Sequence, residues 1–390
     1  MQPNFENTAI AFELKTDSQL ERAYFLFKMI ANEPLVKIGT AVTNFAIKAH
    51  LPVEGLIRAT VFDHFCGGVS EKDCLSVIEN MFEKGVCSIL DYSAEGKEVD
   101  NQFDFAMEKT LEILDFVKEK DAIPFAVFKP SGFGRFKVYE KISAGAKLTD
   151  TETAEWGRIK NRYEKVCKKA HDLEVGLLID AEESWMQQAA DDLALEMMRK
   201  YNKDKAIVYN TFQMYRWDRM DYLKKLHNIA SEENFKIGAK VVRGAYMEKE
   251  NERAQEKGYK SPICRNKQET DENFNAAIAY IMDHLDEIAI FAGTHNEDST
   301  LKLIAHMQDR NLDTSDAHVW FGQLFGMSDH ITFNLAAQGY NAVKYVPYGP
   351  VRDVMPYLIR RAEENTSVAG QTSRELALLQ KERKRRKLDS

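Results

Sequence analysis

The stretch Val86-Cys-Ser-Ile-Leu-Asp-Tyr92 opens the part of the chain in which short apolar runs alternate with long amphipathic segments. Runs rich in Val, Ile and Phe that are separated by helical patterns are typical of repeated βα units around a parallel sheet. Seven more runs follow: Ile123–Lys129, Val175–Asp180, Ala206–Asn210, Lys236–Val242, Ile288–Thr294, Ala317–Phe321 and Ala342–Val346. The eight units predict a closed (βα)8 barrel, with functional side chains at the carboxyl ends of the strands.

A doubly wound open sheet is the structural alternative. Neither GxGxxG nor GxxxxGK[ST] follows any of the runs, so a Rossmann fold and a P-loop are unsupported and the barrel is preferred. Upstream, residues 5 to about 85 read as helices. They include Ser18–Ala31, capped by Asp17 or Ser18, and Ser70–Lys84, which ends at Gly85. The sequence therefore predicts an N-terminal helical segment (1–84), a barrel (85–370) and a basic C-terminal tail (371–390).

Composition narrows the class of protein. The chain has 390 residues, of which 44% are hydrophobic and 29% charged, and these values are typical of a globular protein with a large core. The net charge of -8 disfavours a nucleic-acid partner. The five cysteines lack CxxC spacing, which favours a reducing compartment and disfavours a metal site. With no secretory signal and no long apolar run, we expect a cytoplasmic protein whose membrane association would be peripheral, on the inner face of the cell membrane.

Polar side chains recur where the predicted strands end. They are Asp91, Lys129, Asp180, Asn210, Gln213, Arg243, Thr294 and Tyr345. Lys129 could be an anion clamp or a Schiff-base amine of the aldolase type. Asp180 follows the next strand and could hold Lys129 as a cation, which makes a poor imine former and a good carboxylate ligand.

Other spacings exclude several kinds of active site. The nine histidines show no HxH or HExxH spacing, and no GxSxG is present, so a zinc site and acyl transfer are unsupported. What remains is a site with cations for an anionic substrate and amides and hydroxyls for a polar planar cofactor, a description that a flavin fits. A further helix carries Arg360 and Arg361, which could close on a small anion, with Glu364 spaced to pair with either arginine.

Six segments together resemble one family, FAD-dependent proline dehydrogenase, and they occur in that family's order over residues 85 to 366. They are Phe128-Lys129-Pro-Ser-Gly-Phe-Gly-Arg135, Leu178-Ile-Asp180-Ala-Glu-Glu183, Asn210-Thr-Phe-Gln213-Met-Tyr215, Lys240-Val-Val-Arg243-Gly-Ala-Tyr246, Gly293-Thr-His295-Asn296 and Tyr357-Leu-Ile-Arg360-Arg361-Ala-Glu-Glu364-Asn365. The resemblance implies a distorted (βα)8 barrel that binds FAD non-covalently. It also implies the first step of proline degradation, the oxidation of L-proline to Δ1-pyrroline-5-carboxylate by hydride transfer from proline C5 to FAD N5.

By the same resemblance, the electrons pass to a membrane quinone and no residue acts as a classical acid or base. The chain ends soon after the barrel, so we expect the single-function form, whose product a separate pyrroline-5-carboxylate dehydrogenase would use. The implied substrate-binding residues are Lys129, Asp180, Tyr246, Tyr345, Tyr357, Arg360 and Arg361. The implied FAD-binding residues are Asn210, Gln213, Lys240, Arg243, Gly244, Ala245, Thr294, His295, Asn296 and Glu364.

Two other functions stay open at this point. One is an aldolase-type lyase without flavin that uses Lys129 as a nucleophile, and the other is a non-catalytic barrel that binds an amino acid. The basic run Lys381–Lys387 has two interpretations as well. It is either a solvated end of the chain or a surface that docks on anionic lipid.

Overall fold

The computed structural model describes residues 2–32, 34, 36, 39, 54–92, 98–367 and 371–388; at residues 56, 59, 362–367 and 371 it describes the backbone alone. Eight parallel strands form a closed barrel in the order β1 to β8. The predicted fold class is therefore confirmed. In the described part of the chain, no helix is long and apolar enough to cross a membrane.

The strands match the predicted runs, with differences at their ends. They are β1 (Val86–Tyr92), β2 (Phe125–Phe128), β3 (Gly176–Ile179), β4 (Val208–Gln213), β5 (Ile237–Val242), β6 (Ile288–Gly293), β7 (Val319–Leu324) and β8 (Ala342–Tyr348). Asn210 was expected at the end of its strand but lies in the middle of β4. Tyr345 and Asp91 likewise lie inside β8 and β1, before the last residue of each.

The chain divides into two compact units, and unit 2 comprises residues 96–322. Its parallel strands pair in sequence order from β2 to β7. Phe125 packs edge-on against Phe291 and Trp320, with ring centroids 5.5 and 5.1 Å apart. Glycines make room for these rings, since a Cβ at Gly176 would lie 2.3 Å from Phe125 and one at Gly322 would lie 2.4 Å from Phe291. Large and small residues therefore alternate in this core.

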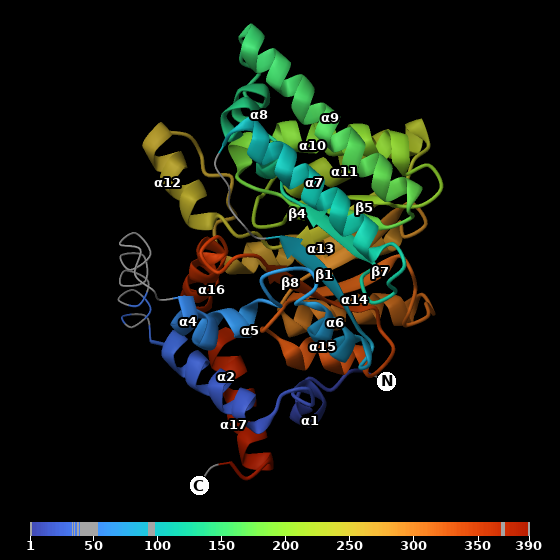
Figure 1. The fold of residues 1–390 in the computed structure, drawn as a ribbon. Helices are drawn as coiled ribbons and strands as arrows, with labels where there is room; N and C mark the ends of the chain where they lie inside the picture. Colours follow the sequence, from blue (N-terminus) through green and yellow to red (C-terminus); the bar gives the residue numbers. More distant parts are fainter. Residues whose placement is uncertain are drawn as a thin grey trace. The chain divides into compact units, whose positions relative to one another are not determined.

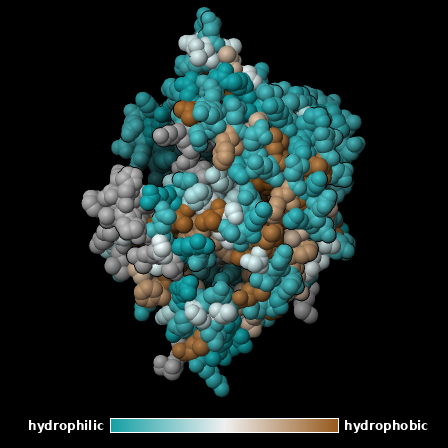
Figure 2. Space-filling view, viewed as in Figure 1, coloured by the Kyte–Doolittle hydropathy of each residue, from teal (hydrophilic) through white to brown (hydrophobic). Residues whose placement is uncertain are grey.

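The helices of unit 2 follow the strands as the βα pattern predicts. They are α7 (Asp100–Val117), the 3-10 turn η2 (Pro130–Gly132), α8 (Phe136–Ser143), α9 (Asp150–Asp172), α10 (Ser184–Tyr201), α11 (Arg219–Glu233), α12 (Met247–Lys257), α13 (Lys267–Asp283) and α14 (Glu297–Asp309). The longest, α9, begins at a capping box in which Thr149 and Glu152 bond each other's backbone. It buries Ile159, Tyr163 and Val166, while its outer face is hydrophilic (Figure 2).

Unit 1 comprises residues 1–95 and 323–390 and contains β1 and β8. Its helices are α1 (Thr8–Ala11), α2 (Asp17–Ile30), α4 (Glu54–Ile57), the π-helix η1 (Arg58–Phe62), α5 (Asp63–Phe65), α6 (Leu75–Phe82), α15 (Asp329–Ala336), α16 (Met355–Ser367) and α17 (Gln371–Arg385). The predicted cap of α2 was wrong, because Thr16 caps it in a box with Gln19. The second predicted helix is shorter than expected and begins at Leu75. Most of residues 33–53 lie outside the described residues.

The expected basic tail is largely the helix α17, which lies beside α2 in unit 1 (Figure 1). Leu378 and Leu379 are buried in a cluster with residues of α2 that include Leu20 and Phe27. Arg383 pairs with Glu21 at 2.6 Å, and the Arg386 guanidinium pairs with Asp17 at 3.0 Å and donates to the Phe12 carbonyl at 2.8 Å. The helical part of this run is therefore packed on one side, while Lys384 and Arg385 on its other side are exposed to solvent.

Candidate functional site

Five of the predicted site residues lie at the carboxyl ends of neighbouring strands in unit 2. Lys129 and Asp180 directly follow β2 and β3, Gln213 ends β4, and Arg243 and Thr294 directly follow β5 and β6. Because β2 to β6 are parallel and paired in order, these ends share one edge of the sheet. The hydrogen bonds and ion pairs show which of the side chains meet.

Asp180 lies between two lysines. Its carboxylate is 2.5 Å from the ammonium of Lys240, a buried residue of β5, and 3.5 Å from the ammonium of Lys129, which is about one-third exposed. Burial alone would raise the pKa of Asp180, but the charges of Lys240 and Lys129 lower it below its ordinary value. The sequence predicted a pairing of Asp180 with Lys129, whereas the shorter contact is with Lys240, 60 residues away in the chain.

Arg243 is fixed by three partners in unit 2. Its guanidinium donates to Asp271 at 2.7 Å, to the Thr294 hydroxyl at 2.7 Å and to the Ser299 hydroxyl at 3.0 Å. It also lies over the ring of Phe274, 4.5 Å from the centroid. The predicted residues Arg243 and Thr294 are therefore brought together, with Thr294 as an acceptor for the arginine.

Asn296 has a local structural role. Its side-chain oxygen accepts from the Ser299 amide at 2.8 Å and caps α14. The backbone N–H of Asn296 donates to the Thr294 hydroxyl at 3.1 Å. Its neighbour His295 is half-buried.

The amides of Asn210 and Gln213 are engaged with protein groups. Asn210 is 1% exposed and donates to Asp191 at 2.8 Å. Asp191 is fully buried and forms an ion pair with Arg219 at 2.9 Å. Gln213 donates to the backbone carbonyl of Glu182 at 2.7 Å. These two residues therefore connect β4 to the loop after β3 and to α10.

The turn after β5 exposes its backbone. Gly244 has φ +130°, and a Cβ there would lie 2.6 Å from the ring of Tyr215, so the position requires glycine. Gly244 and Ala245 are exposed, and Tyr246 is half-buried immediately before α12. The helices α12 and α14 thus begin within a few residues of the carboxyl ends of neighbouring strands, where backbone N–H groups favour anions.

This donor set fits a flavin dinucleotide. Such a cofactor presents a diphosphate, which requires cations and N–H donors, and a planar ring with hydrogen-bonding edges. Unit 2 supplies the cations of Lys240 and Arg243, the exposed backbone at Gly244 and Ala245 and the starts of two helices. The residues are of the right chemical kinds to hold FAD.

The predicted residues of unit 1 lie on β8 and α16. Tyr345, Tyr357 and Arg361 are each less than one-tenth exposed, and Arg360 is half-buried. The Arg361 guanidinium lies 5.3 Å from the centroid of the Tyr357 ring, one helical turn earlier. The side chain of Glu364 lies outside the described residues, and so does its predicted pairing with the two arginines.

The family model for proline dehydrogenase matches residues 74–374. The chain belongs to the proline dehydrogenase family. The predicted enzyme class, proline dehydrogenase, is therefore confirmed.

Similar proteins include members of this family and a biosynthetic protein. The carbapenem antibiotics biosynthesis protein CarD of Pectobacterium carotovorum is 38% identical over 364 residues, which are 92% of this chain and 94% of that protein. Mitochondrial proline dehydrogenase 1 of Dictyostelium discoideum is 32% identical over 86% of this chain and 66% of its own length. The human mitochondrial proline dehydrogenase 1 is 39% identical over 60% of this chain, and the match spans only 40% of the human protein.

Among solved structures, proline utilization A from Bdellovibrio bacteriovorus resembles the fold. The TM-score is 0.70 at 19% sequence identity, over 94% of this chain and 38% of that one. The (βα)8 barrel of this proline dehydrogenase family member therefore has a known structural counterpart.

Several residues that were not predicted from the sequence hold the predicted ones in this family member. They are Ser131, Glu182, Asp191, Arg219, Asp271 and Ser299. Glu182 could have been noticed as a second carboxylate two residues after Asp180. No sequence spacing points to Asp191 or Asp271, because their roles depend on helix packing.

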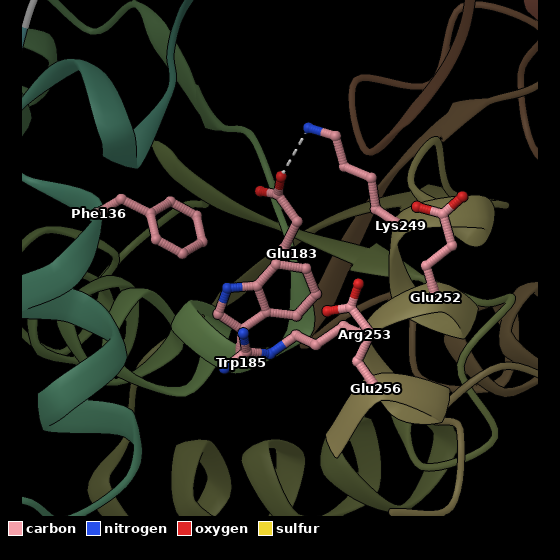
Figure 3. A pocket seen from close by; sticks show the side chains of 7 residues that line it. All are labelled: Phe136, Glu183, Trp185, Lys249, Glu252, Arg253 and Glu256. Carbon is pink, nitrogen blue, oxygen red and sulfur yellow. Dashed lines mark hydrogen bonds and ion pairs between the residues drawn. The ribbon is translucent and has the colours of Figure 1, made fainter. Parts of the chain in front are cut away.

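An open pocket of about 380 Å³ lies in unit 2 between α8, the start of α10 and α12 (Figure 3). Glu183 and Lys249 point toward each other across it, 3.1 Å apart, and the Arg253 guanidinium lies over the Trp185 ring, 4.5 Å from the centroid. None of the residues that the proline dehydrogenase resemblance assigns lines this pocket. We assign it no ligand.

Proposed function

We propose that this protein oxidises L-proline to Δ1-pyrroline-5-carboxylate with bound FAD, passing the electrons to a quinone. Membership of the proline dehydrogenase family supports the substrate and the reaction class. The observation that carries the proposal is the grouping of Lys129, Asp180 and Lys240 at the strand ends of unit 2. It offers two fixed cations beside a carboxylate, which suits a zwitterionic amino acid.

Lys129 is proposed to bind the proline carboxylate, as are Arg360 and Arg361. Arginine guanidinium groups suit this role because they can bind a carboxylate through two parallel hydrogen bonds. We assign Asp180, Tyr246, Tyr345 and Tyr357 to the remainder of the substrate site. A substrate held through its carboxylate can present its C5 hydrogen at a fixed distance and angle, so orientation replaces acid and base groups.

The proline amine must be neutral when the hydride leaves. Nearby cations disfavour the charged ammonium and so lower its pKa. Activity should then rise with pH through one ionisation of bound proline. A rate that does not change with pH would contradict this part of the proposal.

FAD, when bound, supplies the N5 atom that accepts the hydride. Lys240 and Arg243 are proposed to hold it, with Gly244, Ala245, Thr294 and His295. The side-chain amides of Asn210, Gln213 and Asn296 bond to protein atoms. We therefore propose that these three residues shape the FAD site by holding neighbouring elements in place. Glu364 remains a proposed contact on the resemblance alone.

The lyase alternative is disfavoured by the setting of Lys129. Its ammonium faces the Asp180 carboxylate at 3.5 Å, which favours the cation, whereas imine formation requires the neutral amine. Family membership points to oxidation rather than lysis. The binding-only alternative predicts that proline binds without reducing a bound flavin.

The physiological role has two candidates. One is the first step of proline degradation, with a membrane quinone as acceptor, peripheral membrane association and a separate pyrroline-5-carboxylate dehydrogenase to use the product. The other is the same oxidation in a biosynthetic route, which the similarity to CarD over 94% of that protein favours. Failure of a deletion strain to grow on proline as sole nitrogen source would favour degradation, and normal growth would favour the biosynthetic role.

The reaction is tested by an absorbance spectrum of the gently purified protein before and after L-proline is added without oxygen. We expect a flavin spectrum that is bleached by proline, and reoxidation on addition of a soluble quinone. A colourless protein contradicts the proposed cofactor. A yellow protein that binds proline without bleaching supports the binding-only alternative.

A further inference from the structure

Glu182 is a buried carboxylate to which the proposed function gives no role. It lies in the loop between β3 and α10 and is 6% exposed. Its two oxygens accept hydrogen bonds from one residue, the Ser131 amide at 2.7 Å and the Ser131 hydroxyl at 2.6 Å. Ser131 comes two residues after Lys129, in the 3-10 turn η2. Glu182 therefore holds the turn that follows the proposed substrate-binding lysine.

The turn itself is short and well defined. The Gly132 amide donates to the Lys129 carbonyl at 2.9 Å and closes the turn. Pro130 has a fixed φ, and its carbonyl accepts from the Tyr139 hydroxyl at 2.9 Å. With Pro130 restrained from one side and Ser131 from the other, the backbone of Lys129 has little freedom to move.

Glu182 is itself anchored at both of its backbone groups. Its amide donates to Gln187 at 2.8 Å, and its carbonyl accepts from Gln213 at 2.7 Å. Gln187 in turn donates to Asp191 at 2.9 Å. Hydrogen bonds to β4 and α10 thus fix the backbone that carries the Glu182 carboxylate.

The electrostatic setting shows that this arrangement is costly. Burial raises the pKa of Glu182 to about 7, the two hydrogen bonds from Ser131 oppose the rise, the charge of Glu183 adds to it and that of Lys129 lowers it. The charge of Glu182 in turn contributes to the raised pKa of the Tyr139 and Tyr163 hydroxyls. A carboxylate buried without a close counter-ion lowers stability, and such groups are found where position matters more than stability.

We propose that Glu182 is a positioning residue, which holds the η2 turn through Ser131 so that the Lys129 ammonium stays beside Asp180. The inference rests on the proposed function, in which Lys129 binds the proline carboxylate. Loss of the hydrogen bonds between Glu182 and Ser131 should weaken the binding of proline and leave the rate of the chemical step nearly unchanged.

The test is a double-mutant cycle of E182A and K129A with kinetics on L-proline. We expect E182A to raise KM about tenfold with kcat changed less than twofold. In the K129A background, E182A should add less than a twofold further rise, because its effect passes through the lysine. E182Q keeps an acceptor for the Ser131 amide and should restore a KM within threefold of wild type. An equal KM rise with or without Lys129 would overturn the proposal.

A second measurement does not depend on turnover. Hydrogen exchange of peptides covering residues 129–136 should be at least tenfold faster in E182A than in wild type or E182Q. S131A, which removes only the hydroxyl, should give a smaller increase in the exchange rate. It replaces E182A in this measurement if E182A does not fold. E183Q is the matched control, since it changes the neighbouring carboxylate, which pairs with Lys249, and should alter neither KM nor exchange.

Unchanged exchange in E182A, or in S131A if E182A does not fold, would overturn the proposal whatever the kinetics. If proline fails to bleach the wild-type flavin, the proposed function fails on its own, and the exchange measurement still decides whether Glu182 holds the turn.

Discussion

The carboxylate of Asp180 and the ammonium of Lys240 lie 2.5 Å apart and join the end of β3 to β5 within unit 2. Both residues are largely shielded from water, and the more exposed Lys129 lies 3.5 Å from the other carboxylate oxygen. One carboxylate thus balances two lysines. A bound substrate carboxylate would change this balance by adding a second negative charge.

Removing the Asp180 charge should strongly destabilise the protein. D180N removes the negative charge that lies 2.5 Å from the buried Lys240 ammonium, which costs about 3–5 kcal/mol of unfolding free energy. K129M removes the more exposed partner and should cost no more than about 1 kcal/mol. Urea unfolding of the purified variants measures both, and equal losses would show that Lys240 does not depend on Asp180.

The pH dependence of this pair follows from the lowered pKa of Asp180. A carboxyl group whose folded pKa is lowered adds stability above its unfolded pKa and loses it as pH falls through the folded value. The stability difference between wild type and D180N should therefore be constant from pH 5 to 8. It should shrink only in acid below the ordinary pKa of an aspartate.

The arginines of α16 should act on substrate binding. R360M and R361M each remove a cation proposed for the proline carboxylate, and we expect KM to rise at least tenfold, about 1.4 kcal/mol or more. The ratio of flavin to protein absorbance should be unchanged. R361K should recover part of the affinity, because lysine keeps the charge but not the paired hydrogen bonds. Loss of flavin with an unchanged KM would assign these residues to the cofactor instead.

The strands could be predicted because their signal is local. The run Val86–Tyr92 is β1 to the residue, since continuous apolar sequence followed by a helical pattern requires a buried parallel strand. The polar residues at strand ends followed from this. Their partners did not, because Asp180 and Lys240 are 60 residues apart and only the pairing of β3, β4 and β5 in the sheet brings them together.

Helix ends and surface charge were harder to predict. Asp17 and Ser18 were reasonable caps, but Thr16 has the extended backbone that a cap requires, and sequence does not reveal this. The basic run after Lys381 resembled a solvated tail because its charge hid an apolar face. Leu378 and Leu379 are one helical turn upstream, and they make α17 part of the packed unit.

Burial of Glu182 should make stability depend on pH near neutrality. Its folded pKa is raised to about 7, so its stabilising contribution is complete below about pH 4.5 and is lost as pH rises through 7. The glutamine of E182Q does not ionise, so this variant does not lose stability in the same way as pH rises. Unfolding by urea should therefore show E182Q gaining on wild type between pH 5 and pH 8, and a difference that is the same at both pH values would contradict the raised pKa.

Two exposed lysines, Lys384 of α17 and Lys387 just after that helix, test the proposed membrane association. Lys384 and Lys387 are exposed, whereas Arg383 and Arg386 pair with acidic residues of the chain. Each basic residue near an anionic bilayer adds about 1 kcal/mol, so K384E/K387E should reduce binding to vesicles containing phosphatidylserine more than tenfold.

The charge-matched control is K224E/K225E on α11. Because truncation at residue 380 would also remove the Arg383 and Arg386 contacts with α2, substitution is the cleaner test. Equal sedimentation of the two variants would exclude docking through α17.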